Sequence, residues 1–514
     1  MQQDERQNGS FWLPLFVVVL GAFAAILNNS SVNVALPKLM AIFGVQADQI
    51  QWVLTAYMLA SGVVIPVTGY LGDAYGTKRI YLVALIVFTA GSVLCGLAWN
   101  NNSMIVARVI QGIGGGAIMP VSMVIVYRIV PRNMIGTALG VWGMAAVTAP
   151  AIGPTLGGYV VEHLNWRFLF TMNVPVGVLG ILLGSMLLPE SQVKKGLKFD
   201  LWGFVTSTAG CFALLLALSQ GQKEGWGSYY IVSLLVFSFF MLLLFVLIEL
   251  SIPEPMLDLR LFKNAVFSIS VFGGSLITLG LFGGVFLIPI FTQNLMGKSA
   301  METGLMLMPA ALVSAVMMPI SGALFDRIGA RLITFLGLVI VAWGTWEFKN
   351  LSINSTVMYV TVVAAIRSVG MGLAMMPMTT AGMNTIPQQE VGRASALNNV
   401  CRQVAASFGI AVLTTVMQSR QTFHFAHLAE SVTVSSPLAP MVTRQISALA
   451  ALNAGAGAGQ GSVLALITGL AARESLVMAI DDTFLVAAII IAFAIPTALF
   501  LGKGKERAQL PASR

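Results

Sequence analysis

The sequence predicts an all-α membrane protein in which two six-helix bundles and two extra helices cross a lipid bilayer. Hydrophobic residues make up 57% of the chain and charged residues only 9%, whereas soluble proteins carry about 25% charged residues. The apolar runs are long enough to cross a bilayer as helices, and they lack the alternation of barrel strands. A motif that occurs twice relates the two halves of the chain and indicates a duplication.

Fourteen runs reach the length of about 20 apolar residues that a membrane-spanning helix needs. Because fourteen is even, both ends of the chain are expected on one side. Placing both termini in the cytoplasm puts most Lys and Arg residues in inner loops, in agreement with the positive-inside rule. The predicted spans are 12–35, 50–71, 80–98, 104–127, 137–160, 168–188, 200–219, 229–250, 266–290, 304–325, 331–348, 357–381, 393–417 and 481–501.

The repeated motif lies in the loop between the second and third predicted spans. Its small residues allow close approach of the flanking helices, its Asp can hold a helix end, and its basic residue stays at the membrane surface. The second copy follows the tenth span, so two spans are inserted into a six-plus-six arrangement. The matching residues are Pro66, Gly69, Leu71, Asp73, Gly76 and Lys78 in one copy and Pro319, Gly322, Leu324, Asp326, Gly329 and Arg331 in the other.

This pairing divides the chain into three expected regions. They are an N-terminal six-helix bundle (1–190), a connector with two extra transmembrane helices (191–263), and a C-terminal six-helix bundle (264–514) that includes a long outer loop (418–480). A Gly/Ala tract at 453–461 and the pair His424 and His427 lie in that loop. Two histidines are too few for a convincing metal site, so no metal is expected.

Composition also excludes several functions. The net charge is +8, but the Lys and Arg residues are dispersed over short loops, which argues against binding to nucleic acid. The three cysteines lie in different apolar runs without disulfide or metal spacing. No span holds a nucleophile and base in catalytic spacing, so we expect neither an enzyme nor a cofactor.

Three motifs carry a resemblance to a known family. Residues 69–79 resemble the signature loop between helices 2 and 3 of the major facilitator superfamily, residues 108–114 its helix 4 motif, and residues 153–158 the helix 5 motif associated with antiporters. Shorter pieces are similar to the fourteen-helix drug:proton antiporters of the EmrB/QacA type: Leu36-Pro37, Trp166-Arg167, Asn173-Val174-Pro175, Phe199-Asp200 and Gly225-Trp226. The resemblance implies the major facilitator fold and proton-driven multidrug efflux across a bacterial cell (inner) membrane.

In the resembled family the signature loop latches the outward-open state. The loop could instead serve only as a topology signal, but the glycines and the Asp favour a latch. The expected latch residues are Gly69, Asp73, Gly76, Lys78, Arg79, Asp326 and Arg331.

Three arginines lie inside predicted spans, where a charge is costly and normally faces a cavity or a partner. They are Arg108, with Gln111 one turn along, and the deeper Arg367 and Arg402. The resemblance implies that Arg108 relays protons or contacts substrate; a structural role remains the alternative for each arginine.

The first span departs from the subfamily pattern, because Asn28 stands where the subfamily usually carries an Asp. We find no other carboxylate at mid-depth, and Asn398 is likewise neutral. A cavity of Arg and amide groups without a buried acid favours neutral or anionic amphiphiles over cations. Met371 and Met375 suggest an adaptable apolar wall, with ordinary core packing as the alternative.

The fifth span is expected to bend and to pack tightly at the seam between the halves, because proline removes backbone donors and glycine permits close contact. The residues concerned are Pro150, Gly153, Pro154, Gly157 and Gly158.

These observations predict an alternating-access exporter of hydrophobic or amphiphilic small molecules. A lipid or lysolipid translocator and a non-transporting sensor or scaffold are the alternatives. The expected partners are membrane lipids and a small-molecule substrate, with a periplasmic adaptor protein in a Gram-negative cell, and a monomer is expected.

Overall fold

The computed structural model describes residues 11–191, 193–194, 196–431 and 460–502, and every regular element in these ranges is a helix. The first half contains α1 (Trp12–Phe43), α2 (Ala47–Ile50), α3 (Trp52–Val64), α4 (Thr68–Tyr75), α5 (Thr77–Gly96), α6 (Asn101–Ile129), α7 (Ile135–His163), α8 (Phe168–Thr171) and α9 (Asn173–Leu187). A hairpin of α10 (Leu201–Glu224) and α11 (Tyr229–Ser251) follows. The second half contains α12 (Ala265–Ile290), α13 (Ala300–Ile328), α14 (Ala330–Glu347), α15 (Val357–Asn384), α16 (Val391–Ser431) and α18 (Gln460–Leu499).

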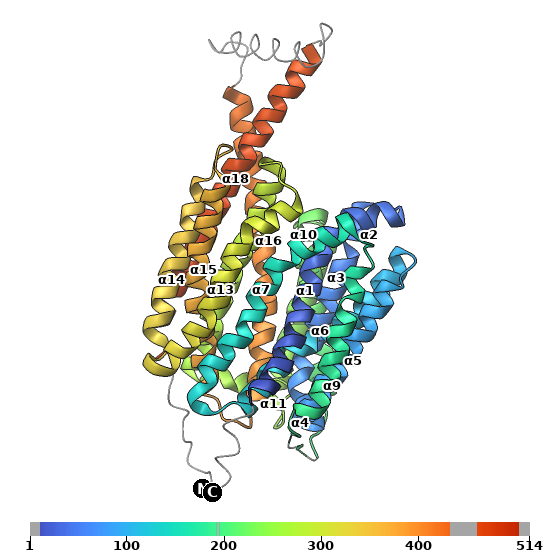
Figure 1. Cartoon of the computed structure of the whole chain (residues 1–514), viewed down its shortest axis with the longest axis vertical. Coiled ribbons are helices and arrows are strands. Elements are labelled where there is room, and N and C mark those ends of the chain that lie inside the picture. The colour runs from blue at the N-terminus through green and yellow to red at the C-terminus, as the bar shows by residue number, and fades with distance from the viewer. Residues whose placement is uncertain (1–10, 192, 195, 432–459, 503–514) are drawn as a thin grey trace.

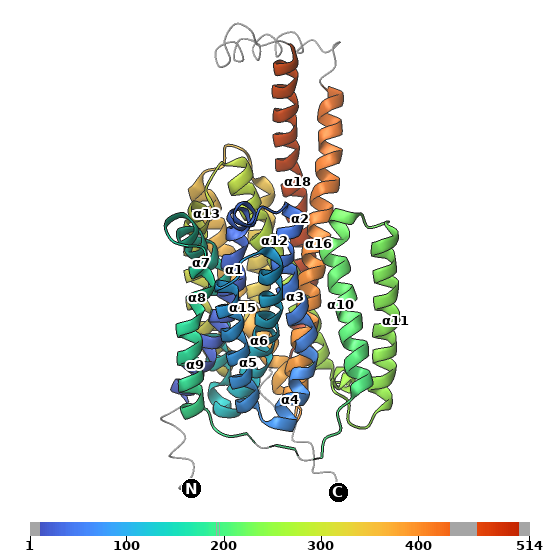
Figure 2. The same cartoon turned by 90° about the vertical axis from the view of Figure 1, so that its right-hand side faces the viewer.

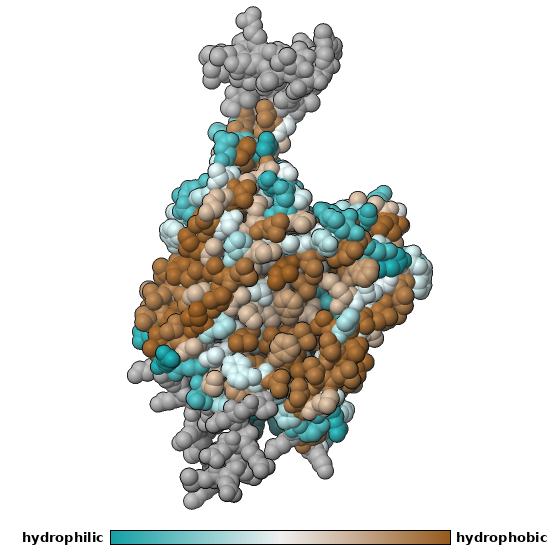
Figure 3. All heavy atoms as spheres, viewed as in Figure 1, coloured by the Kyte–Doolittle hydropathy of each residue, from teal (hydrophilic) through white to brown (hydrophobic). Residues whose placement is uncertain are grey.

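The helices confirm the predicted all-α membrane fold. Thirteen of the described helices are long and apolar enough to cross a membrane, and a bent pair within α7 makes up to fourteen. The start of α1 and the end of α18 lie at the same end of the molecule (Figure 1); the terminal residues themselves fall outside the described ranges. Figure 3 shows apolar residues across the middle of the visible face and hydrophilic residues toward its two ends, as expected for a protein that spans a bilayer.

Several helices begin at side chains that accept hydrogen bonds from the first turn. Asn100 accepts from the Ser103 amide before α6, Asp200 accepts from Gly203 before α10, and Ser299 forms a capping box with Glu302 before α13. Such caps satisfy amides that the helix itself leaves without a partner. The sequence thereby fixes where these helices start at the two surfaces of the membrane.

The prediction of one long outer loop over 418–480 is wrong. Helix α16 continues to Ser431 and α18 already begins at Gln460, and the two extend side by side beyond the other helices (Figure 2). The mean hydropathy is lower where α16 and α18 extend beyond the membrane, so these segments do not look like membrane spans. Residues of good helix propensity nevertheless continue both helices there. His424 also contacts Asp482 at 2.8 Å rather than lying in a solvated loop. Most of the Gly/Ala tract lies outside the described residues.

The α10–α11 hairpin stands on one side of the molecule, with α10 next to α16 and α11 outermost (Figure 2). Helix α11 is apolar around its whole circumference and exposes large side chains such as Phe239 and Phe240. Such a helix lies either in a protein core or in a membrane, and the exposure of these side chains indicates contact with lipid. Within the described hairpin, α10 is the helix that contacts both halves of the protein, through Thr55 of α3 and Gln418 of α16.

Candidate functional site

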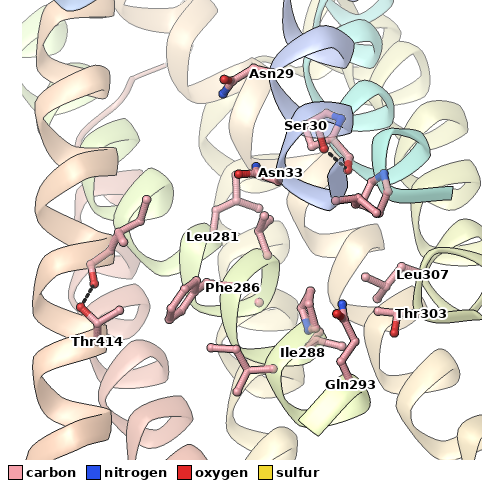
Figure 4. A pocket seen from close by; sticks show the side chains of 18 of the residues that line it. Asn29, Ser30, Asn33, Leu281, Phe286, Ile288, Gln293, Thr303, Leu307 and Thr414 are labelled. Carbon is pink, nitrogen blue, oxygen red and sulfur yellow. Dashed lines mark hydrogen bonds between the residues drawn. The ribbon is translucent and has the colours of Figure 1, made fainter. Parts of the chain in front are cut away.

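A cavity of about 920 Å³ lies between the two halves. Helices α1, α3 and α7 line it from the first half, α12, α13, α15 and α16 line it from the second, and α10 completes the wall. Figure 4 shows Asn29 and Asn33 projecting from one side of α1, with Phe286 and Thr414 across the space from them. The lining continues to Pro37 and Gln222, near the outer ends of their helices.

The cavity wall combines apolar surface with amides and a single charge. Seven side-chain amides line it: Asn29, Asn33, Gln51, Gln222, Gln293, Asn294 and Gln418. Among the described lining residues, Arg367 is the one charged side chain, and no carboxylate is present. The wall therefore offers hydrogen bonds to polar groups of many shapes but favours only negative charge.

Arg367 is held along one edge by the protein. Its Nε donates to Thr345 Oγ1 at 2.9 Å, and its NH2 group donates to the carbonyl oxygens of Gly280 at 3.1 Å and Leu281 at 3.4 Å. No hydrogen bond to its NH1 group is found within the described part of the chain. Gly344 permits this position, because a Cβ there would lie 2.9 Å from the Arg367 Cβ.

Arg108 and Gln111 lie in a separate, fully buried network. Arg108 donates to Gln111 Oε1 at 2.7 Å, to the Val53 carbonyl at 3.0 Å and to Asn29 Oδ1 at 3.2 Å. Its guanidinium also lies 4.3 Å from the centre of the Tyr57 ring. Neither Arg108 nor Gln111 lines the cavity; Arg108 reaches it only through Asn29.

The other predicted site residues divide between the cavity and the packed interior. Met371 lines the cavity, whereas Met375 is buried away from it. Asn28 is fully buried and accepts a hydrogen bond from Asn173 Nδ2 at 3.0 Å, so it faces α9. Asn398 and Arg402 also lie outside the lining, and Arg402 donates only to the Met375 sulfur at 3.8 Å among the described residues.

The end opposite the projecting helices carries the basic loops, which assigns it to the cytoplasm. There Asp326 of α13 binds the first turn of α7 in the other half. It accepts hydrogen bonds from the Gly136 and Thr137 amides at 3.0 Å each and from Thr137 Oγ1 at 2.9 Å. A carboxylate is well placed at a helix N-terminus. Gly322 permits the close approach, because a Cβ there would overlap the Gly136 backbone.

Asp73 makes a different set of contacts at the same end. It binds Lys194 Nζ at 2.8 Å and Arg128 NH2 at 3.7 Å, and Lys194 donates onward to the Gln389 carbonyl at 3.1 Å, just before α16. Gly69 packs on the backbone at Gly392. Sequence reasoning missed the roles of Lys194 and Arg128 because both lie far from the motif in the chain.

The remaining motif residues occupy the same surface. Lys78 pairs with Glu190 at 3.2 Å, and Gly76 ends α4 with a φ of 93°, a conformation that favours glycine. Arg79 and Arg331 are exposed. The cytoplasmic end is thus closed by contacts between the halves, while the cavity extends toward the outer end.

Helix α7 bends by 41° between Pro150 and Ile152. Pro154 has no amide hydrogen, so it cannot donate to the Pro150 carbonyl, and Ser30 Oγ of α1 donates to that carbonyl at 2.9 Å instead. Gly153 faces the Ser30 side chain of α1 and Gly157 faces the α1 backbone at Ser31, whereas Gly158 faces α13. Both prolines line the cavity, so this helix forms the seam between the halves.

The contribution of α10 to the cavity was not anticipated from the sequence. Leu218, Ser219 and Gln222 line the wall. Ser219 Oγ lies 3.4 Å from Thr55 Oγ1 of α3. On the other side, Thr415 of α16 accepts from Trp226 Nε1 at 2.8 Å and donates to Gln222 Oε1 at 2.9 Å, and Gln222 also bonds Gln418. The signal that could have indicated this role is the polar group Ser219-Gln220-Gly221-Gln222, which lies at the end of an apolar span.

Comparison with known proteins decides the family. The model of the Major Facilitator Superfamily matches residues 18–410. The chain belongs to the major facilitator superfamily. The MFS-type transporter YhcA of Bacillus subtilis is 35% identical over 504 residues, covering 98% of this chain and 95% of the relative. The multidrug transporter protein MdtP of the same organism is 32% identical over 404 residues, covering 78% and 74%.

Among solved structures, the proton:xylose symporter XylE of the superfamily superposes with a TM-score of 0.59 at 14% identity. The match covers 95% of this chain and 97% of XylE. At this identity the similarity shows the fold alone. The protein is therefore a multi-pass cell-membrane transporter of the major facilitator superfamily, and the resemblance seen in its motifs is confirmed.

Proposed function

We propose that this transporter exports hydrophobic or amphiphilic small molecules by alternating access, driven by the proton motive force, with neutral or anionic substrates favoured. The observation that carries the proposal is the cavity wall. It is apolar over much of its area, it offers amides from several helices, and Arg367 is its one charged group among the described lining residues. Apolar pockets with a few polar groups are typical small-molecule sites.

The arrangement of contacts supports alternating access. The cavity lies between the halves, and Asp326 ties α13 to α7 at the cytoplasmic end. A substrate from the cytoplasm enters only when these contacts separate. The contacts at the cytoplasmic end then form again after the substrate has entered. Transport therefore alternates between a state that is closed to the cytoplasm and a state that is closed to the outside.

The named relatives support efflux as the direction of transport. MdtP is described as a multidrug transporter, and a relative in Mycobacterium tuberculosis, 31% identical over 416 residues, as a multidrug resistance protein B homolog. The residues that line the cavity favour some substrate charges over others. A cation in this cavity meets a guanidinium and no carboxylate among the described residues, whereas a neutral or anionic molecule meets no repulsion.

The test uses three probes with one tail: 5-phenylpentane-1-sulfonate, 5-phenylpentan-1-ol and (5-phenylpentyl)trimethylammonium. Binding to the folded state raises the unfolding temperature, so we expect stabilisation by the sulfonate and the alcohol and little by the cation. In inside-out vesicles with an acidic lumen, labelled sulfonate should accumulate, and a protonophore should abolish accumulation. Stabilisation by the cation alone, or accumulation that persists without the gradient, would contradict the proposal.

A further inference from the structure

Arg367 is a buried guanidinium without a counter-ion. It is 6% exposed, and no ion pair joins it to a carboxylate within the described ranges. Three hydrogen bonds satisfy its Nε and NH2 groups, and all three acceptors are neutral. A guanidinium presents five N–H groups in a planar fork. The protein thus orients the side chain but leaves its charge uncompensated.

The free edge of this fork lies against a glycine of the cavity wall. A Cβ on Gly284 would overlap Arg367 NH1 and would lie 2.7 Å from Cζ and 3.0 Å from NH2. Both Gly284 and Arg367 line the cavity. Any larger residue at position 284 would push the guanidinium out of its present position. Glycine therefore leaves room for NH1 to lie directly against α12 at the cavity wall.

The neighbouring glycine has a different environment. A Cβ on Gly283 would lie 3.2 Å from Ala487 Cβ and 3.4 Å from a Leu413 methyl group, facing α16 and α18. Gly283 is not part of the cavity lining. Two adjacent glycines thus serve different purposes, helix packing at 283 and room for the guanidinium at 284.

We infer that Gly284 and Arg367 form a subsite for the oxyanion head group of the substrate, which binds through one oxygen to the NH1 edge. Nε and NH2 are occupied by the protein, so the pairing is one-sided rather than bidentate. The apolar body of the substrate then lies along Phe286 and Ile288, which follow Gly284 on α12 and line the same cavity. This inference rests on the proposed function and specifies its substrate as an amphiphile with a carboxylate or sulfonate head.

The test compares Gly284→Ala with Gly283→Ala in the full-length protein. The probe is 5-phenylpentane-1-sulfonate, and tetraphenylborate serves as an anion whose charge is shielded by its rings and which has no head group to dock. A charge-assisted hydrogen bond corresponds to about a 10- to 150-fold change in affinity. Gly284→Ala should weaken sulfonate binding on this scale and leave tetraphenylborate binding nearly unchanged, whereas Gly283→Ala should change neither.

Arginine substitutions separate the head-group contact from the charge. Arg367→Ala should weaken binding of both anions, and Arg367→Gln is the alternative if the alanine variant does not fold. Arg402→Ala removes a half-buried arginine of α16 that lies outside the lining and should have little effect.

The inference is overturned if wild-type protein binds the sulfonate and Gly284→Ala binds it equally well, or if Gly283→Ala and Arg402→Ala weaken it as much. Failure of every amphiphilic probe to bind or to be transported would instead refute the proposed function.

Discussion

Replacement of Asp326 by Asn should shift the transporter toward a state open to the cytoplasm. Asp326 accepts three hydrogen bonds from the first turn of α7, all across the interface between the halves. Asn keeps the shape but loses the charge, and its NH2 group faces an N–H or O–H donor whichever way the amide turns. Losing one or two charge-assisted bonds and the helix-dipole interaction costs about 2–4 kcal/mol. The equilibrium between closed and open cytoplasmic ends should change by a factor of about 30 to 900.

The assay is alkylation of a single cysteine placed at Met376. This residue of α15 is 2% exposed, and its side chain packs on Gly143 of α7. The three native cysteines are first replaced, and a small thiol reagent is added to inside-out vesicles. Asp326→Asn should raise the alkylation rate. Asp48→Asn, which changes an exposed carboxylate at the outer end, is the matched control and should not.

Asp73→Asn should raise the alkylation rate less than Asp326→Asn does. Asp73 pairs with Arg128 and Lys194, and among the described residues the hydrogen bond from this group to the second half is the one from Lys194 to the Gln389 carbonyl. The reasoning is refuted if Asp326→Asn folds and is alkylated at the wild-type rate, or if Asp73→Asn has the larger effect.

Three further changes test the packing around the cavity. Gly157→Val should lower the unfolding temperature, because a Cβ at Gly157 would lie 2.7 Å from a carbonyl oxygen of α1 and overpacking costs about 1–3 kcal/mol. Gly158→Ala should be tolerated, because a Cβ at Gly158 would lie 3.4 Å from its nearest neighbours. Trp226→Phe removes the hydrogen bond to Thr415, worth about 0.5–1.5 kcal/mol, and should speed amide hydrogen exchange in the outer turns of α10; unchanged exchange would contradict the assigned contact. Asn28→Asp should lower the unfolding temperature without increasing affinity for cations, because this side chain faces α9; a gain in cation binding would place it in the cavity.

The sequence predicted the fold well because span length, loop charge and an internal repeat all report on the membrane directly. It also singled out Arg367, since a charge inside a long apolar run is visible without a structure. It could not distinguish Asn28 from Asn29. In a helix that is buried on nearly every side, hydrophobic periodicity does not identify the face that meets a cavity. The partners of Asp73 were hidden for another reason, because Lys194 comes from a connector more than a hundred residues away.

The position of α10 has a mechanical consequence for the transport cycle. Against the first half, α10 packs Leu215 and Leu216 on Leu59 of α3, places Ser219 Oγ 3.4 Å from Thr55 Oγ1, and pairs Lys223 with Asp48 at 3.8 Å. Against the second half, hydrogen bonds from Trp226, Thr415 and Gln222 join the same end of the hairpin to α16. Because the hairpin is attached to both halves, one of these two contact surfaces has to slide when the halves rock. The half that keeps the hairpin is the larger moving body, and it carries α11 and the surrounding lipids through the bilayer at each turnover. Thickness and stiffness of the surrounding membrane thereby become determinants of transport rate.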